Sequence, residues 1–292
     1  MDEKQILTCV EINYAKNILE NNFSDDDDSE LNLVGIITMK NKNIFFTDKF
    51  NNTRKMDWTE KSAPKFLCSG LVMQIIGKKK MDHDKPTDII VKDYKFPNTV
   101  IKRNLVVSSP VAICHTLSSN EKIDQIVKKV DTPDIYIMGA NVDVRLMDVI
   151  NYLSKFSKTF HFMPGSNDLV SRSFPLCFQG FRDGKNVRMK ELPHQQEGIL
   201  FLNNNLHLKK MIRNSNLSIS LIEAMELIYD SKQPFFSNRI LRRKEMTHDA
   251  TILVCDGDDL FCKPYKDGYL VVLPLSKILL LNNNVPEFID LE

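Results

Sequence analysis

The apolar and polar positions near the start of the chain follow the period of a helix. Over residues 3–22, apolar side chains recur three and four positions apart, which predicts an amphipathic helix. The positions that set this spacing are Leu7, Val10, Tyr14 and Ile18. An acidic run over residues 24–30 then breaks the period, and it is typical of a solvated loop. We therefore expect residues 1–22 to form an N-terminal helix.

Residues 31–98 consist of short β-type runs separated by turn-like residues. The runs occupy residues 33–39, 67–76, 89–91 and 94–96. No convincing long helix lies among them. Several short strands with turn signals are typical of a small barrel or sandwich, so residues 23–98 are expected to form one β domain.

After Pro97, strand-like and helix-like segments alternate. Apolar runs at residues 105–108, 134–138 and 159–163 have the length of buried strands, and helical spacing separates each from the next. Two strand–helix–strand steps predict parallel pairing, with helices on the faces of the sheet. The remaining predicted segments are a helix over residues 218–229 and strands over residues 198–202, 250–254, 268–274 and 277–281. Residues 99–292 are therefore expected to form one α/β domain.

Composition and charge narrow the function classes. The 292 residues are 42% hydrophobic and 26% charged, which predicts a packed core. The net charge of +1 lacks the basic excess of a strong non-specific nucleic-acid binder. Six cysteines without a C-x-x-C pair argue against a local zinc site, and they favour reduced cysteines in an intracellular protein. No secretory signal and no membrane-spanning stretch is expected.

Candidate chemistry is expected just past the carboxyl ends of the strands, where open α/β sheets collect their reactive groups. Four segments fall at such places. They are Ser108-Ser109-Pro110, Gly139-Ala140-Asn141, Met163-Pro164-Gly165-Ser166-Asn167-Asp168 and Asp256-Gly257-Asp258-Asp259.

The Met163–Asp168 segment resembles the calcineurin-like metallophosphoesterase superfamily. More closely, it resembles the inactive members that serve as small (regulatory, B) subunits of the eukaryotic replicative DNA polymerases alpha, delta and epsilon, with delta the nearest. Other segments resemble the same family in the same order: Tyr14-Ala15, Leu33-Val34-Gly35, Gly70–Gly77, Val91–Pro97, Phe174–Phe178 and Phe201-Leu202. The resemblance implies an α+β multidomain fold. An OB-type β-barrel over residues 23–98 would be followed by an inactivated phosphoesterase α/β sandwich over residues 99–292.

The resemblance also implies an inactive site. A binuclear phosphoesterase centre needs carboxylates and imidazoles around two metal ions. In the family's ligand positions this chain has Ser108 and Pro110 first, Ala140 for a bridging aspartate, Asn167 for a histidine before Asp168, and Asp258 for the last histidines. No metal, no cofactor and no catalysis is therefore expected.

Several polar residues keep more than one interpretation. The family's later single histidine could be His194, His207 or His248. His115 and His161 are better explained as packed imidazoles, Asp168 as a turn cap, and Asp256 to Asp259 as an acidic loop. The basic clusters at residues 78–80 and 239–244 are expected to be solvated.

By the same resemblance, the chain is a nuclear scaffold in DNA replication. It would bind the C-terminal cysteine-rich domain of the polymerase catalytic subunit, hold a third subunit where one exists, meet DNA only indirectly and contact no membrane. Affinity would come from apolar patches. Interface candidates are Trp58, Phe174, Phe178, Phe235 and Phe236.

Three alternatives stay open. The chain could be the small subunit of polymerase alpha or epsilon. It could be a divergent active phosphodiesterase that uses Asp168 with Asp256, Asp258 or Asp259. It could also be a single-stranded nucleic-acid binder that stacks bases on barrel aromatics such as Trp58.

Overall fold

The chain forms two compact units of mixed α and β structure with several sheets. The first unit comprises residues 1–102 and 210–248, and the second comprises residues 103–209 and 249–292. The computed structural model describes residues 31–40, 43–48, 52–58, 64, 67–82, 85–96, 107, 109–115, 119–139, 146–165, 168, 170, 176–179, 182–213, 215, 218–233 and 248–291. The helix predicted over residues 3–22 and the acidic run lie outside these ranges.

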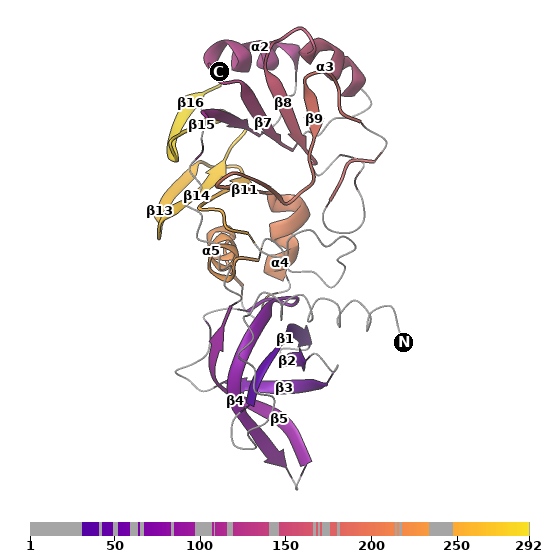
Figure 1. Ribbon diagram of the computed structural model, residues 1–292, viewed down its shortest axis with the longest axis vertical. Helices are drawn as coiled ribbons and strands as arrows, with labels where there is room; N and C mark the ends of the chain where they lie inside the picture. Colours follow the sequence, from indigo (N-terminus) through magenta and orange to yellow (C-terminus); the bar gives the residue numbers. More distant parts are fainter. Residues whose placement is uncertain are drawn as a thin grey trace. The chain divides into compact units, whose positions relative to one another are not determined.

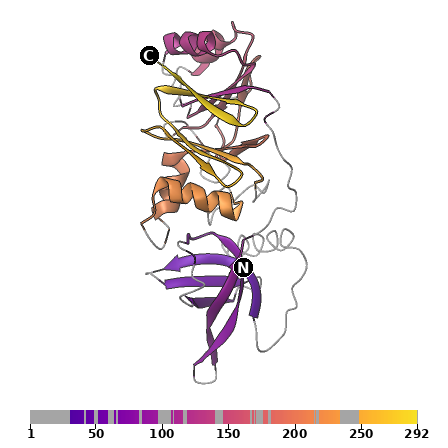
Figure 2. The same cartoon turned by 90° about the vertical axis from the view of Figure 1, so that its left-hand side faces the viewer.

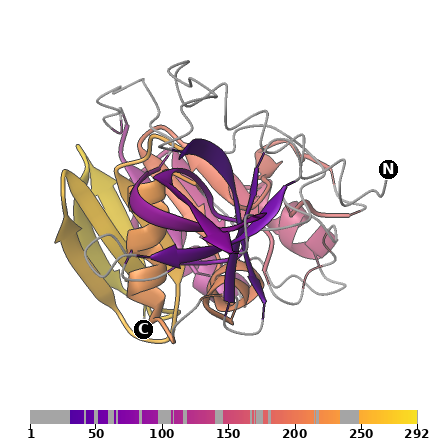
Figure 3. The same ribbon diagram turned by 90° about the horizontal axis from the view of Figure 1, so that it is seen from below.

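The first unit contains a closed five-stranded barrel in the order β1-β2-β3-β5-β4 (Figure 1; Figure 3). The β3–β5 pair is parallel, and the other pairs are antiparallel. The fully buried side chains of Ile37, Met73, Ile75, Ile89 and Val91 come from three of its strands. The strands are β1 (Leu31–Lys40), β2 (Asn43–Asp48), β3 (Thr53–Trp58), β4 (Val72–Asp82) and β5 (Lys85–Lys95).

Two glycines allow the barrel strands to approach each other closely. A Cβ added to Gly35 in β1 would lie 2.2 Å from the Thr47 carbonyl oxygen, and one added to Gly77 in β4 would lie 2.4 Å from that of Ile90. Gly77 also lies at a shift in the β4–β5 register. Glycines and register shifts are the usual means by which strands curve into a barrel.

A helical segment from the middle of the chain belongs to the barrel unit. Helix α5 (Leu221–Ser231) begins with a capping box formed by Ser220 and Glu223, and α4 (Lys209–Arg213) precedes it. The buried Gln233 side chain accepts a hydrogen bond from Val72 N at 2.9 Å and donates one to Val72 O at 2.7 Å. The described residues between 210 and 248 are therefore grouped with the barrel in the first unit.

The second unit contains a six-stranded sheet in the order β16-β15-β6-β7-β8-β9. The four strands from β6 to β9 are parallel, as the alternating pattern predicts. They are β6 (Val111–Cys114), β7 (Asp134–Met138), β8 (Thr159–Met163) and β9 (Val187–Met189), and β15 (Lys277–Asn282) and β16 (Val285–Asp290) are antiparallel to their neighbours. Helices α2 (Asn120–Lys129) and α3 (Leu146–Leu153) cover one face through a shared apolar core (Figure 1).

A five-stranded sheet in the order β10-β11-β12-β14-β13 faces the other side of this sheet (Figure 2). Its strands are β10 (His194–Gln196), β11 (Ile199–Leu202), β12 (Ile252–Asp256), β13 (Phe261–Tyr265) and β14 (Gly268–Leu273), and a π-helix, η1 (Asn204–Leu208), follows β11. The Tyr136 ring of β7 stacks on the Phe201 ring of β11, with centroids 5.0 Å apart. The two sheets therefore share a core between them.

The strand predicted over residues 105–108 falls almost entirely outside the described ranges. A strand was expected over residues 105–108, but the strand that pairs with β7 is β6, Val111–Cys114. Residues 105, 106 and 108 lie outside the described ranges. Pro110 lacks the backbone N–H that a ladder needs, and it stands immediately before β6.

Among the helices of the described ranges, none has the length and apolar composition needed to cross a membrane.

Candidate functional site

The carboxyl ends of the parallel strands in the second unit bring together segments from both sheets. His115 directly follows β6, and Gly139 directly follows β7. Gly165 is the second residue after β8, and Asp256 is the last residue of β12. This edge is where the chemistry of an open α/β sheet is expected. We call the group formed by His115, Gly139, Gly165, Asn203 and Asp256 the carboxyl-edge cluster.

His115 and Asp256 join the two sheets at this edge. The His115 Nε2 atom lies 3.6 Å from Asp256 Oδ2, and the two side chains are 14% and 5% exposed. The other carboxylate oxygen, Oδ1, accepts a hydrogen bond from Asn204 N at 2.6 Å. His115 Nδ1 is buried and has no hydrogen-bond partner within the described ranges. One histidine and one carboxylate thus come together from positions 141 residues apart.

Gly139 is suited to this edge by its backbone conformation and not by a lack of space for a side chain. Its φ of +129° is a backbone conformation that side chains disfavour. A Cβ at this position would lie 3.5 Å from His115 O, 3.8 Å from Gly165 Cα and 3.9 Å from Asn203 Nδ2. The Asn203 side chain itself accepts a hydrogen bond from Leu206 N at 2.8 Å and caps η1.

Asp168 closes the turn that follows β8. Its Oδ2 atom accepts a hydrogen bond from Gly165 N at 2.6 Å, and its own backbone N donates to Gly165 O at 3.2 Å. This geometry agrees with the turn-cap interpretation of the sequence.

Besides Asp168, two of the predicted degenerate ligand positions, Pro110 and Asp258, lie within the described residues. Pro110 stands immediately before the amino end of β6, and His115 follows its carboxyl end. Asp258 is exposed beyond β12, and the buried carboxylate is that of Asp256. Ser108, Ala140 and Asn167 lie outside the described residues.

Two of the five interface candidates, Trp58 and Phe178, lie within the described residues. Trp58 is partly buried at the end of β3, where its ring meets the Tyr94 ring edge-on at 5.8 Å. Phe178 is partly buried against the core beneath α2 and α3. Phe174, Phe235 and Phe236 lie outside the described residues.

The candidates for the family's single later histidine have different surroundings. His248 belongs to the first unit, where its Nε2 atom lies 3.0 Å from Ile228 O. Burial lowers the pKa of His248 to about 3. Burial also lowers the pKa of His194, to about 4, with Lys190 and His161 adding to the effect. His207 is buried in η1. Burial therefore favours the neutral imidazole at His194 and at His248.

His161 is also a packed residue. Its ring stacks on Tyr136 with centroids 4.3 Å apart, and its Nε2 atom lies 2.8 Å from Asp134 Oδ1. Burial lowers its pKa, although the Asp134 carboxylate opposes that shift. The packed interpretation made from the sequence is confirmed for this histidine.

Sequence reasoning missed His115, Asn203 and Asp256 as neighbours. A signal for His115 was present, because it directly follows the apolar run Val111-Ala112-Ile113-Cys114. Asn203 and Asp256 end apolar runs in the same way. The sequence does not show how the two sheets pack against each other, and this packing brings the ends of their strands together.

Within the described part of the chain, the carboxyl-edge cluster supplies too few donors for a binuclear metal centre. Among the residues that the structure describes, no three His, Cys, Asp or Glu side chains gather where they could hold a metal ion. The carboxyl-edge cluster contributes one imidazole and one carboxylate, and one carboxylate oxygen is already bound to a backbone amide. Two metal ions need several more anionic or imidazole donors.

Comparison with known proteins returns no match, either to a protein-family model or to a curated protein.

Proposed function

We propose that the chain is a non-catalytic accessory subunit of a replicative DNA polymerase, of the delta type. The resemblance of the Met163–Asp168 segment and its collinear companions motivates the proposal. In this role the chain binds the C-terminal cysteine-rich domain of the catalytic subunit in the nucleus. It holds a third subunit where one exists, and it reaches DNA only through the holoenzyme.

The barrel supports the OB part of this proposal. A closed barrel of five strands in the order β1-β2-β3-β5-β4, with β3 and β5 parallel, is the architecture that an OB fold requires. Its Trp58 ring packs against Tyr94 and its indole Nε1 is buried. A tryptophan held in this way favours packing over stacking on bases.

The second unit supports the inactivated phosphoesterase part. A parallel β6-β7-β8-β9 core with α2 and α3 on one face and a second sheet on the other suits a phosphoesterase-like sandwich. Its candidate chemistry would then lie at the carboxyl edge.

The observation that carries the non-catalytic role is the use of the polar groups at that edge. Asp168 accepts from Gly165 N, Asn203 accepts from Leu206 N, and Asp256 accepts from Asn204 N. A carboxylate that accepts a backbone amide hydrogen bond stabilises a loop, and the oxygen that accepts it is less able to coordinate a cation. The edge is therefore suited to rigidity, which a docking platform needs.

Affinity purification tests the proposed partner. The full chain carrying a small tag is recovered from its native cells, and its companions are identified by mass spectrometry. We expect the catalytic subunit of polymerase delta among them. Recovery of the alpha or epsilon catalytic subunit would assign the chain to that polymerase instead of delta. Recovery of nucleases without any polymerase would overturn the proposal.

A turnover assay tests the absence of catalysis. Purified chain is incubated with Mn²⁺ and a chromogenic phosphodiester, beside Asp256→Asn and His115→Gln variants. We expect all three proteins to give the same background rate. Turnover that a chelator abolishes and that either substitution removes would establish an active phosphodiesterase and contradict the proposal.

A further inference from the structure

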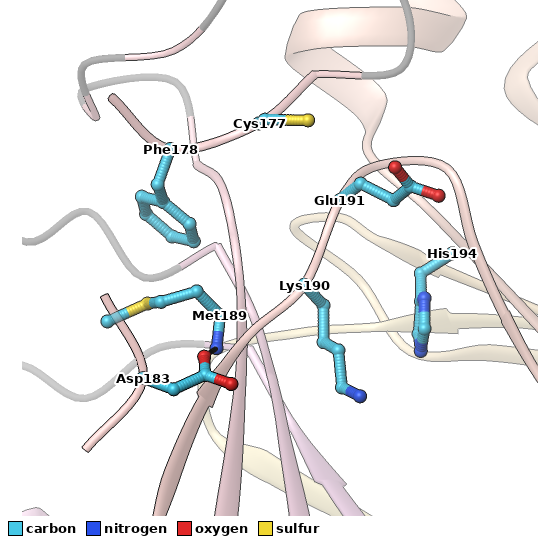
Figure 4. A pocket seen from close by; sticks show the side chains of 7 residues that line it. All are labelled: Cys177, Phe178, Asp183, Met189, Lys190, Glu191 and His194. Atoms are coloured by element: carbon cyan, nitrogen blue, oxygen red, sulfur yellow. Dashed lines mark hydrogen bonds between the residues drawn. The ribbon is translucent and has the colours of Figure 1, made fainter. Parts of the chain in front are cut away.

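A pocket separate from the carboxyl-edge cluster lies where the chain passes from β9 to β10 in the second unit (Figure 4). Its cavity volume of about 430 Å³ is within the range of small-molecule sites. The lining side chains are Cys177, Phe178, Asp183, Met189, Lys190, Glu191 and His194.

One side of the pocket carries the apolar Phe178 and Met189 with the Asp183 carboxylate beside them, and the other carries two nitrogen groups (Figure 4). Phe178 and Met189 lie together on one side, while the Lys190 and His194 side chains extend next to each other on the other (Figure 4). An apolar wall with a few convergent polar groups is the usual composition of a ligand site.

His194 has an unused hydrogen-bonding atom. Its Nε2 is buried, with no hydrogen-bond partner within the described ranges. Its ring is stacked on Phe201 with centroids 6.0 Å apart, which fixes its orientation. A buried polar atom without a partner is costly, so in the Nε2–H tautomer a ligand that supplies an acceptor relieves that cost.

The lining also contains two carboxylates, Asp183 and Glu191, which would repel an anion. Asp183 Oδ1 accepts a hydrogen bond from Met189 N at 2.8 Å, so it is held by the backbone. The Glu191 carboxylate points away from the Lys190 ammonium (Figure 4). The Lys190 ammonium is therefore the group of the pocket that attracts negative charge, and His194, which burial keeps neutral, offers only a hydrogen bond.

We propose that this pocket binds a small organic oxyanion, whose charged group contacts Lys190 and His194 Nε2 and whose apolar body packs against Phe178 and Met189. A carboxylate and a phosphate monoester share the required chemistry, since each offers anionic acceptor oxygens. The inference stands apart from the polymerase proposal and does not depend on it.

The neighbouring backbone favours a small molecule over an extended peptide. A peptide that adds to the free edge of β9 needs the main-chain groups of that edge. Met189 N already donates to Asp183, and Val187 O already accepts from Gly184 N. The edge is covered by its own turn, which is a common protection of edge strands.

Methyl NMR on the full chain tests the proposal. The methionine methyl groups are labelled with ¹³C, and the Met189 signal is assigned with a Met189→Leu variant. The probes are 4-phenylbutyrate, phenyl phosphate and the neutral amide 4-phenylbutanamide. We expect the Met189 signal to shift saturably with at least one anion, with a dissociation constant on the order of a millimolar, and about tenfold more weakly with the amide.

The relative affinities of the two anions identify the source of the oxyanion, and either order supports the site. Lys190→Met should weaken binding of the better anion by about tenfold. His194→Phe, which keeps an aromatic ring on Phe201 but removes Nε2, should weaken it as well. The exposed Lys128 on α2 provides the matched control, and Lys128→Met should leave the affinity unchanged.

The unmodified protein already suffices to overturn the proposal. If neither anion shifts the Met189 signal, or if the amide binds as tightly as the carboxylate and more tightly than the phosphate, the pocket is not an oxyanion site.

Discussion

At the scale of single residues, polar side chains act mainly as hydrogen-bonded links within each unit. Asp168, Asn203 and Asp256 each bind a backbone N–H near the carboxyl edge, and Gln233 binds both backbone groups of Val72. Buried polar groups stabilise a fold only when such partners are present. These links therefore fix loops and helices in place.

The Gln233 link should contribute measurably to stability. Replacing it with leucine leaves Val72 N and Val72 O buried without their side-chain partner. We expect Gln233→Leu to lower the free energy of unfolding by about 2 kcal/mol, measured by urea denaturation. Gln179→Leu changes an exposed glutamine and should cost much less. Equal losses in the two variants would mean that the Gln233 amide is not a structural link.

The buried His248 should make the protein sensitive to mild acid. Its folded pKa of about 3 lies below the unfolded value, so the unfolded chain binds the proton more readily. Its contribution to stability is complete above pH 6.5 and is lost as the pH falls towards 3. Between pH 7 and pH 5 this amounts to about 2 kcal/mol.

A His248→Gln variant isolates that contribution, because glutamine can donate to Ile228 O but does not titrate. We expect the difference in unfolding free energy between pH 7 and pH 5 to be smaller in the variant than in the unaltered chain. Identical pH profiles from chemical denaturation would contradict a buried, neutral His248.

At the scale of secondary-structure elements, strands with two buried faces are predictable from sequence. Residues 134–138 and 159–163 were expected as strands, and β7 and β8 occupy those ranges. The helical spacing expected before residues 134–138 corresponds to α2, which begins at Asn120 with Ser119 as its cap. Continuous apolar runs and a capping serine are local signals, so no tertiary information is needed for them.

Edge and barrel strands carry weaker signals. β13 is an edge strand with exposed Lys263 and Pro264, and β3 buries only Met56. Polar residues and proline on such strands prevent unwanted pairing, and they also remove the apolar pattern that sequence reasoning uses. The same lack of pattern explains why β9 and β10, which have three residues each, were not predicted.

The barrel should depend on the absence of a side chain at residue 35. In Gly35→Ala, the new methyl group would meet the Thr47 carbonyl at 2.2 Å, so β1 and β2 must separate. We expect a loss of at least about 2 kcal/mol of unfolding free energy, or failure to fold. Gly184→Ala meets only side-chain carbons, at 3.3 and 3.5 Å, and should be close to neutral. Thermal unfolding followed by circular dichroism distinguishes the two outcomes.

At the scale of the whole molecule, the chain order does not match the order of the compact units. The link between Gln233 and Val72 spans 161 residues, and no local pattern in either segment indicates it. The carboxyl-edge cluster also depends on contacts between distant segments, because His115 and Asp256 meet only where the two sheets pack together. The individual residues of this site could be proposed from sequence, but their neighbourhood could not.

Direct binding to a polymerase catalytic subunit is the central claim. The purified full chain is mixed with the isolated C-terminal cysteine-rich domain of the polymerase delta catalytic subunit from the same organism. The mixture is analysed by size-exclusion chromatography with light scattering. The account predicts a stable complex that contains both proteins, and two separate peaks at micromolar concentrations would contradict it.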